Sequence, residues 1–347
     1  MKFYTLRVLD IRFETADTVT VSFKQPGLKA IKYSAGQYLS LIFRINNRRY
    51  IRPYSFSSAP GVEKTLNITV KKVHRGIISN HIIDKLKVDD IVEVMEPMGD
   101  FTLNDSETRS NIYLWGAGSG ITPLMSIAKY AIHNDKAVSV HLIYGNRDYE
   151  NIIFKNEIKE MEKSFKDVFF ARHFITKPFI GDSNPNIVQG RITAAEVKAI
   201  LGNNKNKLNN SLHYICGPIG LKESVKFVLA EYGINETQIF SEDFEVNRDP
   251  KDFENIRTQY VSIRQNAKEP LKVEVVAGKS ILDAGLDSFI DLNYSCQTGN
   301  CLVCRGRILK GEVKMIGVKQ IPEGLNQDEC LLCSSFPLTD NVEIEIN

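Results

Sequence analysis

Five of the six cysteines lie near the carboxyl end of the chain, at spacings typical of metal ligands. Cys301, Cys304, Cys330 and Cys333 form a C-x2-C…C-x2-C array, which on its own suggests tetrahedral zinc. The alternative array replaces Cys330 with Cys296 and has the C-x4-C-x2-C…C spacing of plant-type 2Fe-2S centres. A separation of 25 residues between Cys304 and Cys330 is long for the two knuckles of a zinc ribbon, and it favours iron.

The residues around the cysteines also favour an iron-sulfur cluster. Residues 271–292 are typical of a strand of alternating apolar residues, a glycine turn and a helix capped by Ser280. Small, turn-forming residues between Cys296 and Cys301 suit a loop that wraps a cluster and points backbone N–H groups at its sulfurs. The motif "YSCQTGNCLVCRG…LLC" resembles a plant-type ferredoxin of the β-grasp type, in which the last ligand follows a short apolar run. The ligands predicted for a 2Fe-2S cluster are therefore Cys296, Cys301, Cys304 and Cys333, and zinc is the alternative.

The segment "RPYSFSS", residues 52–58, combines the groups that a flavin requires. These are a cation for the phosphate, an aromatic face against the ring and a short hydroxyl near N5, which Arg52, Tyr54 and Ser55 supply in that order. Strand alternation would place Arg52 and Tyr54 on one side and Ser55 on the other, so a twist or bulge is required. The alternative is an ordinary surface pair of arginine and tyrosine.

Two glycine-containing turns predict phosphate-binding sites. In "RGIISN", residues 75–80, Gly76 precedes a helix whose free N–H groups would bind phosphate; the alternative is a plain turn capped by Ser79. In "GAGSGITP", residues 116–123, a strand enters a helix through glycines that let a pyrophosphate approach the backbone. Gly120 comes one position too early for G-x-G-x-x-G, so we expect dinucleotide binding without a standard Rossmann dehydrogenase, or else only a tight turn.

These motifs lie on two kinds of predicted elements. Short strands occupy residues 1 to about 105, with one helix near residues 79–86, and predict a small antiparallel barrel. From about residue 110, strands and helices alternate, which predicts a parallel sheet covered on both faces. The strands are expected at 111–120, 137–146, 168–176 and 212–217, and the helices at 122–134, 154–165, 193–201 and 220–233.

The predicted fold is multi-domain. We expect an antiparallel β-barrel flavin domain at 1–106, an α/β parallel-sheet nucleotide domain at 107–245, and an α+β β-grasp ferredoxin domain at 260–347. The polar, aperiodic residues 246–259 are predicted to be the linker.

Composition limits the classes of function. A chain of 347 residues with 43% hydrophobic and 25% charged residues is typical of a soluble protein of two or three domains. A formal net charge of +2 does not predict a nucleic-acid surface, and no apolar run is long enough to span a bilayer. The first residues lack the apolar block of a signal peptide, and the cysteines are arranged as ligands, so we expect a cytoplasmic protein.

Taken together and in order, the motifs "GQYL", "RPYSFSS", "RGIIS", "GSGITP", "YGNR" and "YICGP" resemble the ferredoxin-NADP reductase family over residues 1 to about 245. With the iron domain behind it, the whole chain resembles the reductase components of bacterial oxygenases, in particular the phenylacetyl-CoA epoxidase reductase type. The resemblance implies FAD as the flavin, although a related branch binds FMN.

The resemblance also assigns residues to each cofactor. The flavin contacts it implies are Arg52, Tyr54, Ser55, Ser58, Val70, Lys71 and Phe244, with the FAD diphosphate held by Gly76, Ile78 and Ser79. The nicotinamide dinucleotide would be held by Gly118, Thr122, Cys216, Gly217 and Pro218. Cys216 would lie beside the reacting carbon, although a lone thiol at the end of a strand is also typical of an inert core residue.

The three predicted sites form a chain for electrons. A nicotinamide gives up two electrons as a hydride and a cluster accepts one, so a flavin is required between them. The predicted function is an NAD(P)H-dependent reductase that delivers electrons to an oxygenase, with Ser55 donating a hydrogen bond to flavin N5. The alternatives are another acceptor, such as a hybrid-cluster protein or a P450, and a flavin domain fused to a zinc-stapled binding module. Arg147 and Lys177 favour NADPH over NADH, because a 2′-phosphate requires cations, although exposed loop positions also explain both.

Overall fold

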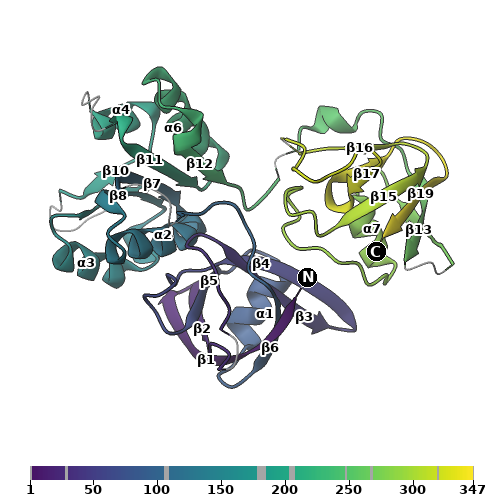
Figure 1. The fold of residues 1–347 in the computed structure, drawn as a ribbon, viewed down its shortest axis with the longest axis horizontal. Coiled ribbons are helices and arrows are strands. Elements are labelled where there is room, and N and C mark those ends of the chain that lie inside the picture. Colours follow the sequence, from purple (N-terminus) through teal and green to yellow (C-terminus); the bar gives the residue numbers. More distant parts are fainter. Residues whose placement is uncertain are drawn as a thin grey trace. The chain divides into compact units, whose positions relative to one another are not determined.

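The structure is a computed structural model that describes residues 2–27, 30–104, 109–177, 185–202, 208–246, 248–265, 269–318 and 320–346 (Figure 1). The chain divides into two compact units. The first contains residues 1–41 and 54–242, and the second contains residues 42–53 and 243–347. The predicted domain boundary at 106/107 lies outside the described residues.

The amino-terminal strands form a six-stranded sheet in the order β4-β3-β6-β1-β2-β5. Strand β1 pairs antiparallel with β2 and β6, and β2 pairs antiparallel with β5. An antiparallel bridge from Phe56 to Ile68 joins the chain just after β4 to β5, so the two ends of the sheet meet, as the predicted barrel requires. The elements are β1 (Phe3–Thr15), β2 (Thr18–Phe23), β3 (Tyr38–Ile45), β4 (Arg48–Ser55), β5 (Leu66–Lys71), α1 (Ile77–Lys85) and β6 (Ile91–Met95).

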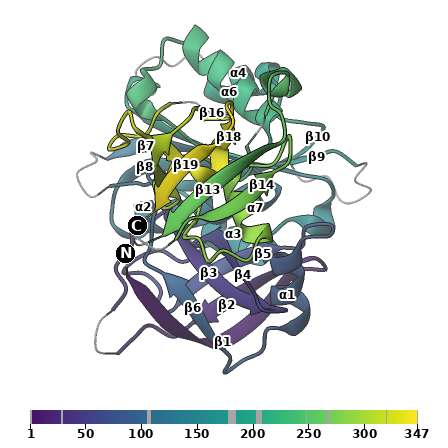
Figure 2. The same ribbon diagram turned by 90° about the vertical axis from the view of Figure 1, so that its right-hand side faces the viewer.

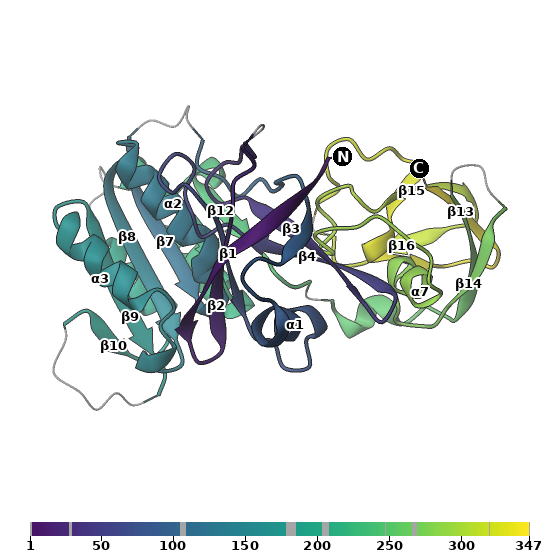
Figure 3. The same cartoon turned by 90° about the horizontal axis from the view of Figure 1, so that it is seen from below.

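The next six strands form a parallel sheet in the order β10-β9-β8-β7-β11-β12, as the alternation of strands and helices predicted (Figure 3). Two short strands, β10 and β12, were not predicted. The strands are β7 (Ser110–Ala117), β8 (Ala137–Asn146), β9 (Phe169–Ile175), β10 (Ile187–Gln189), β11 (Ser211–Cys216) and β12 (Ile239–Glu242). The helices are α2 (Ile121–His133), α3 (Lys155–Ser164), α4 (Ala194–Leu201) and α6 (Ile219–Glu231).

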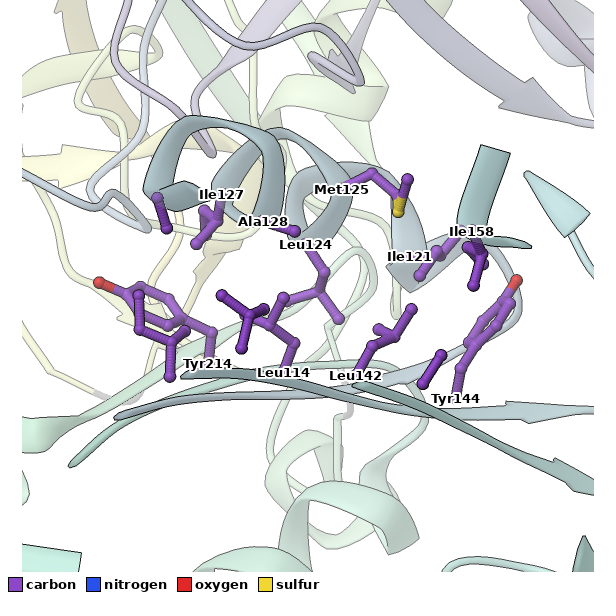
Figure 4. Close-up of a cluster of buried hydrophobic side chains, with 14 of the residues drawn as sticks. Leu114, Ile121, Leu124, Met125, Ile127, Ala128, Leu142, Tyr144, Ile158 and Tyr214 are labelled. Atoms are coloured by element: carbon purple, nitrogen blue, oxygen red, sulfur yellow. The ribbon is translucent and has the colours of Figure 1, made fainter. Parts of the chain in front are cut away.

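Apolar side chains cover both faces of this parallel sheet. On one face, α2 packs against β7, β8 and β11, and α3 packs against β9. Leu124 lies over Leu114, and Ile158 lies beside Tyr144 (Figure 4). On the other face, α4 and α6 pack in a second cluster that contains the buried Trp115. Burial on both faces explains why the strand segments are almost continuously hydrophobic. Packing on both faces fixes the position of each strand, and the strand ends in turn determine where the following loops begin.

The carboxy-terminal strands form a mixed five-stranded sheet in the order β14-β13-β19-β15-β17, in which β13 and β19 are parallel (Figure 2). A two-stranded sheet of β16 and β18 adjoins the segment that carries Cys333. Ser280 caps α7 by accepting the Asp283 N–H at 3.1 Å, as predicted. The elements are β13 (Gln259–Gln265), β14 (Leu271–Val275), α7 (Ile281–Asp287), β15 (Arg305–Lys310), β16 (Val313–Met315), β17 (Glu329–Leu331), β18 (Ser335–Pro337) and β19 (Val342–Ile346).

None of the described helices is long and apolar enough to cross a membrane.

Candidate functional site

The end of β4 carries the predicted flavin residues. Arg52 and Tyr54 are half-buried, whereas Ser55, the last residue of the strand, is buried. The guanidinium of Arg52 donates through Nη1 to the Ile51 carbonyl at 2.8 Å, which holds the end of the side chain against the strand backbone. Burial along this part of β4 does not alternate, since Pro53 is half-buried like Arg52 and Tyr54, and Ser55 differs from all three in being buried.

Ser55 forms a hydrogen bond with Glu242, a residue that sequence reasoning missed. Glu242 ends β12 and lies directly opposite Cys216 of β11 in the parallel register. Its Oε2 atom is buried and has no hydrogen-bond partner in the part of the chain that the structure describes. Burial raises the pKa of the Glu242 carboxyl to about 8, although the hydrogen bond with Ser55 by itself lowers this pKa. At neutral pH this carboxyl therefore holds a proton beside the serine predicted to face flavin N5.

Cys216 lies at the same strand ends and is completely buried. Burial raises the pKa of its thiol well above the ordinary value, and the nearby Glu242 raises it further. The side chain is therefore a neutral thiol rather than a thiolate nucleophile. Ser55, Cys216 and Glu242 come from a barrel strand and two strands of the parallel sheet, and the structure brings them into one cluster.

The other predicted flavin residues differ in their environments. Ser58 is buried, with its hydroxyl 2.8 Å from Tyr33 Oη and accepting the Asn67 N–H at 3.0 Å. Val70 is buried in β5, and Lys71 forms an ion pair with Asp17 at 3.5 Å. Phe244, in the carboxy-terminal unit, is 48% exposed. The roles of these residues at the flavin stay predictions.

Helix α1 begins where a diphosphate site was predicted. Gly76, not Ser79, is the N-cap residue, and no side chain caps this end of the helix. A Cβ atom at position 76 would lie 2.7 Å from Ser79 Oγ, so the close approach of the two residues requires glycine. Ser79 Oγ accepts the Val73 N–H at 3.1 Å and closes the turn, and Ile78 is buried. The backbone N–H groups of the first turn are left for a ligand, because α1 has no capping side chain.

The predicted nucleotide residues meet at the carboxyl ends of β7 and β11. Gly118 has a φ of +55°, and a Cβ at Gly120 would lie 2.1 Å from the Cys216 carbonyl oxygen. Gly217 is also tightly packed but less so, since its Cβ would lie 3.1 Å from the Ala117 backbone nitrogen. Glycine thus allows the turn after β7 to touch the turn after β11. Backbone atoms therefore form this edge of the sheet, which is where parallel sheets bind their ligands.

Two further predicted residues shape the same edge. Thr122 donates its hydroxyl to the Ser119 carbonyl at 2.9 Å and closes the turn into α2. Pro218 is the N-cap residue of α6, with an extended ψ of 154°. Both residues fix the entry of a helix at this edge, and their contact with a nucleotide stays a prediction.

The two cations predicted to select NADPH lie on neighbouring loops. Arg147 follows β8 and is exposed, and the Lys177 N–H donates to its carbonyl at 2.7 Å. Lys177 Nζ contacts Asp148 at 3.1 Å, so part of its charge is neutralised within the protein. Arg147 is therefore the better placed of the two cations for a phosphate.

The four predicted cluster ligands come together as two pairs of thiols. Cys296 and Cys301 form a hydrogen-bonded pair, and Cys304 and Cys333 form another. The Cys301 thiol lowers the pKa of Cys296 to about 5, and Cys304 likewise lowers the pKa of Cys333. Among the described residues, no three His, Cys, Asp or Glu side chains converge as the ligands of a single metal ion do.

Two pairs of thiols fit a 2Fe-2S cluster, which takes four cysteine ligands on two irons. Backbone N–H groups already point at sulfur, with Thr298 N 3.4 Å from Cys296 Sγ and Cys296 N 3.5 Å from Cys301 Sγ. Glycine is required at position 299, where φ is +80° and a Cβ would lie 2.8 Å from Val318. The loop therefore has the wrapped form that was predicted for cluster binding.

Cys330 belongs to a different environment. It lies in β17 opposite Gly306 of β15 and is completely buried. Burial raises the pKa of its thiol to about 11, although the neighbouring Ser335 hydroxyl lowers it. The Cys330 side chain thus belongs to the protein core, which agrees with the predicted 2Fe-2S ligand set, from which Cys330 is absent.

Comparison with family models assigns a class to each part of the chain. Residues 5–103 match an oxidoreductase FAD-binding domain, residues 114–226 an oxidoreductase NAD-binding domain, and residues 265–338 a 2Fe-2S iron-sulfur cluster binding domain. These matches agree with the predicted order of FAD, nicotinamide nucleotide and cluster along the chain. They leave the choice between NADH and NADPH open.

Related proteins align with this chain over nearly its whole length. A subunit of the 1,2-phenylacetyl-CoA epoxidase of Escherichia coli K12 is 28% identical, over 99% of this chain and 98% of its own. The ferredoxin reductase component of 3-ketosteroid-9-alpha-monooxygenase from Rhodococcus rhodochrous is 30% identical, over 96% of this chain and 93% of its own. The structure of phthalate dioxygenase reductase superposes with a TM-score of 0.66 at 20% identity, covering 99% of this chain and 98% of that one, and so has the same fold.

Proposed function

Because the chain belongs to the family of oxygenase ferredoxin reductase components, oxidoreductases with FAD-, nicotinamide- and 2Fe-2S-binding domains, we propose that it delivers electrons from NADPH to an oxygenase. A phenylacetyl-CoA epoxidase-like oxygenase is the proposed acceptor, on the basis of the similarity to the epoxidase subunit of Escherichia coli. The observation that carries the proposal is the pairing of four cysteines in a chain that also has flavin and nucleotide domains. We place this activity in the cytoplasm, where cluster thiolates stay reduced.

The protein's own residues have three tasks in this reaction. A bound FAD supplies the conversion between hydride transfer and single-electron transfer. The backbone turns at Gly118, Gly120 and Gly217 would bind the nucleotide at the sheet edge, and Cys216 is an uncharged, buried residue beneath that edge. Ser55 would donate its hydroxyl proton at flavin N5, while the protonated Glu242 carboxyl would donate to the Ser55 oxygen and so orient the hydroxyl.

The exposed Arg147 supports NADPH as the electron donor, since its guanidinium is available to a 2′-phosphate. Its replacement by alanine should reduce kcat/KM for NADPH about tenfold and leave that for NADH nearly unchanged. Equal losses with both nucleotides would contradict NADPH selection. Lys177→Ala should have a smaller effect, because Asp148 already pairs with that lysine.

The proposed function has a direct test. Purified protein should contain FAD and about two irons with negligible zinc, and should absorb beyond the flavin band. Its NADPH-dependent reduction of a purified phenylacetyl-CoA epoxidase di-iron component should be compared with that of a hybrid-cluster protein and of a P450. Preference for the oxygenase supports the proposal, and preference for either other acceptor overturns it.

The role of Ser55 is tested by flavin reduction. In Ser55→Ala, the stopped-flow rate of flavin reduction by NADPH should fall about 10- to 100-fold, while FAD content stays at the wild-type level. Ser57→Ala is the matched control, because Ser57 is also buried but bonds to Thr69 in the barrel. An unchanged rate in Ser55→Ala would remove this role.

A further inference from the structure

The segment predicted to be a linker packs against the cluster domain. Residues 246 and 248–256, here called the strap, cross Gly317, where φ is +82° and a Cβ would lie 2.3 Å from Val246. At the other end, the Phe253 ring lies edge-on to Phe336 with centroids 5.1 Å apart. Lys314 Nζ donates to the Asp252 carbonyl at 2.8 Å between these points. The strap is thus held along its length, and its side chains have fixed positions.

Arg248 is the strap residue nearest a cluster ligand. Its Nη2 donates to the Cys333 carbonyl at 2.9 Å, and its guanidinium carbon lies 5.4 Å from the centroid of the Phe336 ring. The Nε atom is buried and has no partner within the described ranges of the chain. The contacts with the Cys333 carbonyl and with the Phe336 ring therefore hold a permanent positive charge next to this ligand.

A cavity of about 230 Å³ connects Arg248 to the cluster loop. Arg248 lines it together with Cys333 and with Gln297, which directly follows the ligand Cys296. Two carboxylates, those of Glu245 and Asp283, line the same cavity. Arg248 is the one cation among the residues that line it, so its removal would leave the ligands facing negative charge alone.

We propose that Arg248 is a positioning residue whose charge raises the reduction potential of the 2Fe-2S cluster. One-electron reduction adds a negative charge at the ligands, and a fixed, partly desolvated cation stabilises that charge. The hydrogen bond to the Cys333 carbonyl sets where the cation lies. The inference rests on cluster binding by the four cysteines, which iron content tests separately.

The experiment is a redox titration of the full-length holoprotein, followed by the electron paramagnetic resonance signal of the reduced cluster. Arg248→Gln and Arg248→Met remove the charge, and Met also keeps an apolar stem against Phe336. Arg248→Lys keeps the charge. Lys272→Gln is the matched control, since Lys272 is exposed on β14, at the opposite edge of the sheet from β17.

At the wild-type midpoint potential, the ratio of reduced to oxidised cluster should fall about tenfold in the neutral variants, which for one electron is 59 mV. Arg248→Lys and Lys272→Gln should stay within about twofold of wild type. A neutral variant that holds two irons but keeps the wild-type midpoint overturns the inference, and so does an equal shift in Arg248→Lys. Wild-type protein without iron would instead overturn cluster binding itself.

Discussion

Replacing Glu242 with glutamine should change how the stability of the protein depends on pH. The pKa of this carboxyl is raised from 4.5 to about 8 in the folded protein, because its Oε2 atom is buried. Between these values the folded state binds a proton that the unfolded state has released. The contribution of Glu242 to stability should therefore be highest below about pH 4.5, decrease as pH rises and level off above about pH 8.

The size of the effect follows from the same interval. At 1.36 kcal/mol for each unit of pKa, the rise from 4.5 to about 8 corresponds to about 5 kcal/mol. Two buried histidines change stability in the opposite direction at lower pH, since burial lowers the pKa of His173 to about 4 and that of His213 to about 3. The interval from pH 6.5 to 8 lies above the folded-state pKa values of both histidines. Across it, the contribution of Glu242 to the free energy of unfolding should still change by about 2 kcal/mol.

The assay is urea unfolding at several pH values, followed by the fluorescence of Trp115, the only tryptophan. Trp115 is buried in β7, in the sheet that also contains Glu242. The stability of Glu242→Gln relative to wild type should increase by about 2 kcal/mol from pH 6.5 to 8. The matched control, Glu245→Gln, removes a carboxylate from an exposed position three residues later.

Parallel stability curves for wild type and Glu242→Gln over this range would refute the argument. They would mean that the carboxyl is ionised in the folded protein, and that the Ser55 hydroxyl donates its proton to a carboxylate instead of accepting a hydrogen bond from the neutral acid. A difference infrared spectrum gives an independent check, because the band of a protonated carboxyl should be present at pH 7 in wild type and absent from Glu242→Gln.

Two more predictions concern the cluster and the nucleotide edge. Cys296→Ser should abolish the absorbance of the cluster, whereas Cys330→Ser should keep about two irons, and the reverse pattern in metal analysis would indicate the zinc array. Gly120→Ala should raise KM for NADPH and reduce stability by about 1–3 kcal/mol, because the new Cβ would lie 2.1 Å from the Cys216 carbonyl. Gly220→Ala, whose Cβ would meet no atom within 4 Å, should leave KM unchanged, and similar KM values for both variants would contradict the argument.

Much of the organisation could be predicted from the sequence because it depends on local patterns. The C-x4-C-x2-C spacing brings three ligands into one short loop whatever the rest of the fold does. Glycines at a strand-to-helix junction likewise indicated the nucleotide edge, and the change from short strands to alternating strands and helices indicated two kinds of sheet. In each case, neighbouring residues or a repeating period carry the information.

The sequence alone did not indicate Glu242, which lies on a four-residue strand that was not predicted. An acidic residue at the end of a strand is the one signal that could have found it, and that signal is common in surface loops. Its importance comes from the parallel register that places it opposite Cys216 and from the hydrogen bond with Ser55. The tertiary structure decides such contacts, because they join strands that are far apart in the chain.

The strap is a second feature whose contacts the sequence alone did not indicate. Its polar, aperiodic residues predicted a linker, and nothing in their order indicates that Arg248 bonds to Cys333. The sequence likewise did not indicate that Asp148 pairs with Lys177. The sequence by itself determined which chemical groups the protein has and which local elements carry them. Only the tertiary structure decided which charges are buried, paired or held beside a ligand, since the energy of a charge depends on all the atoms that surround it.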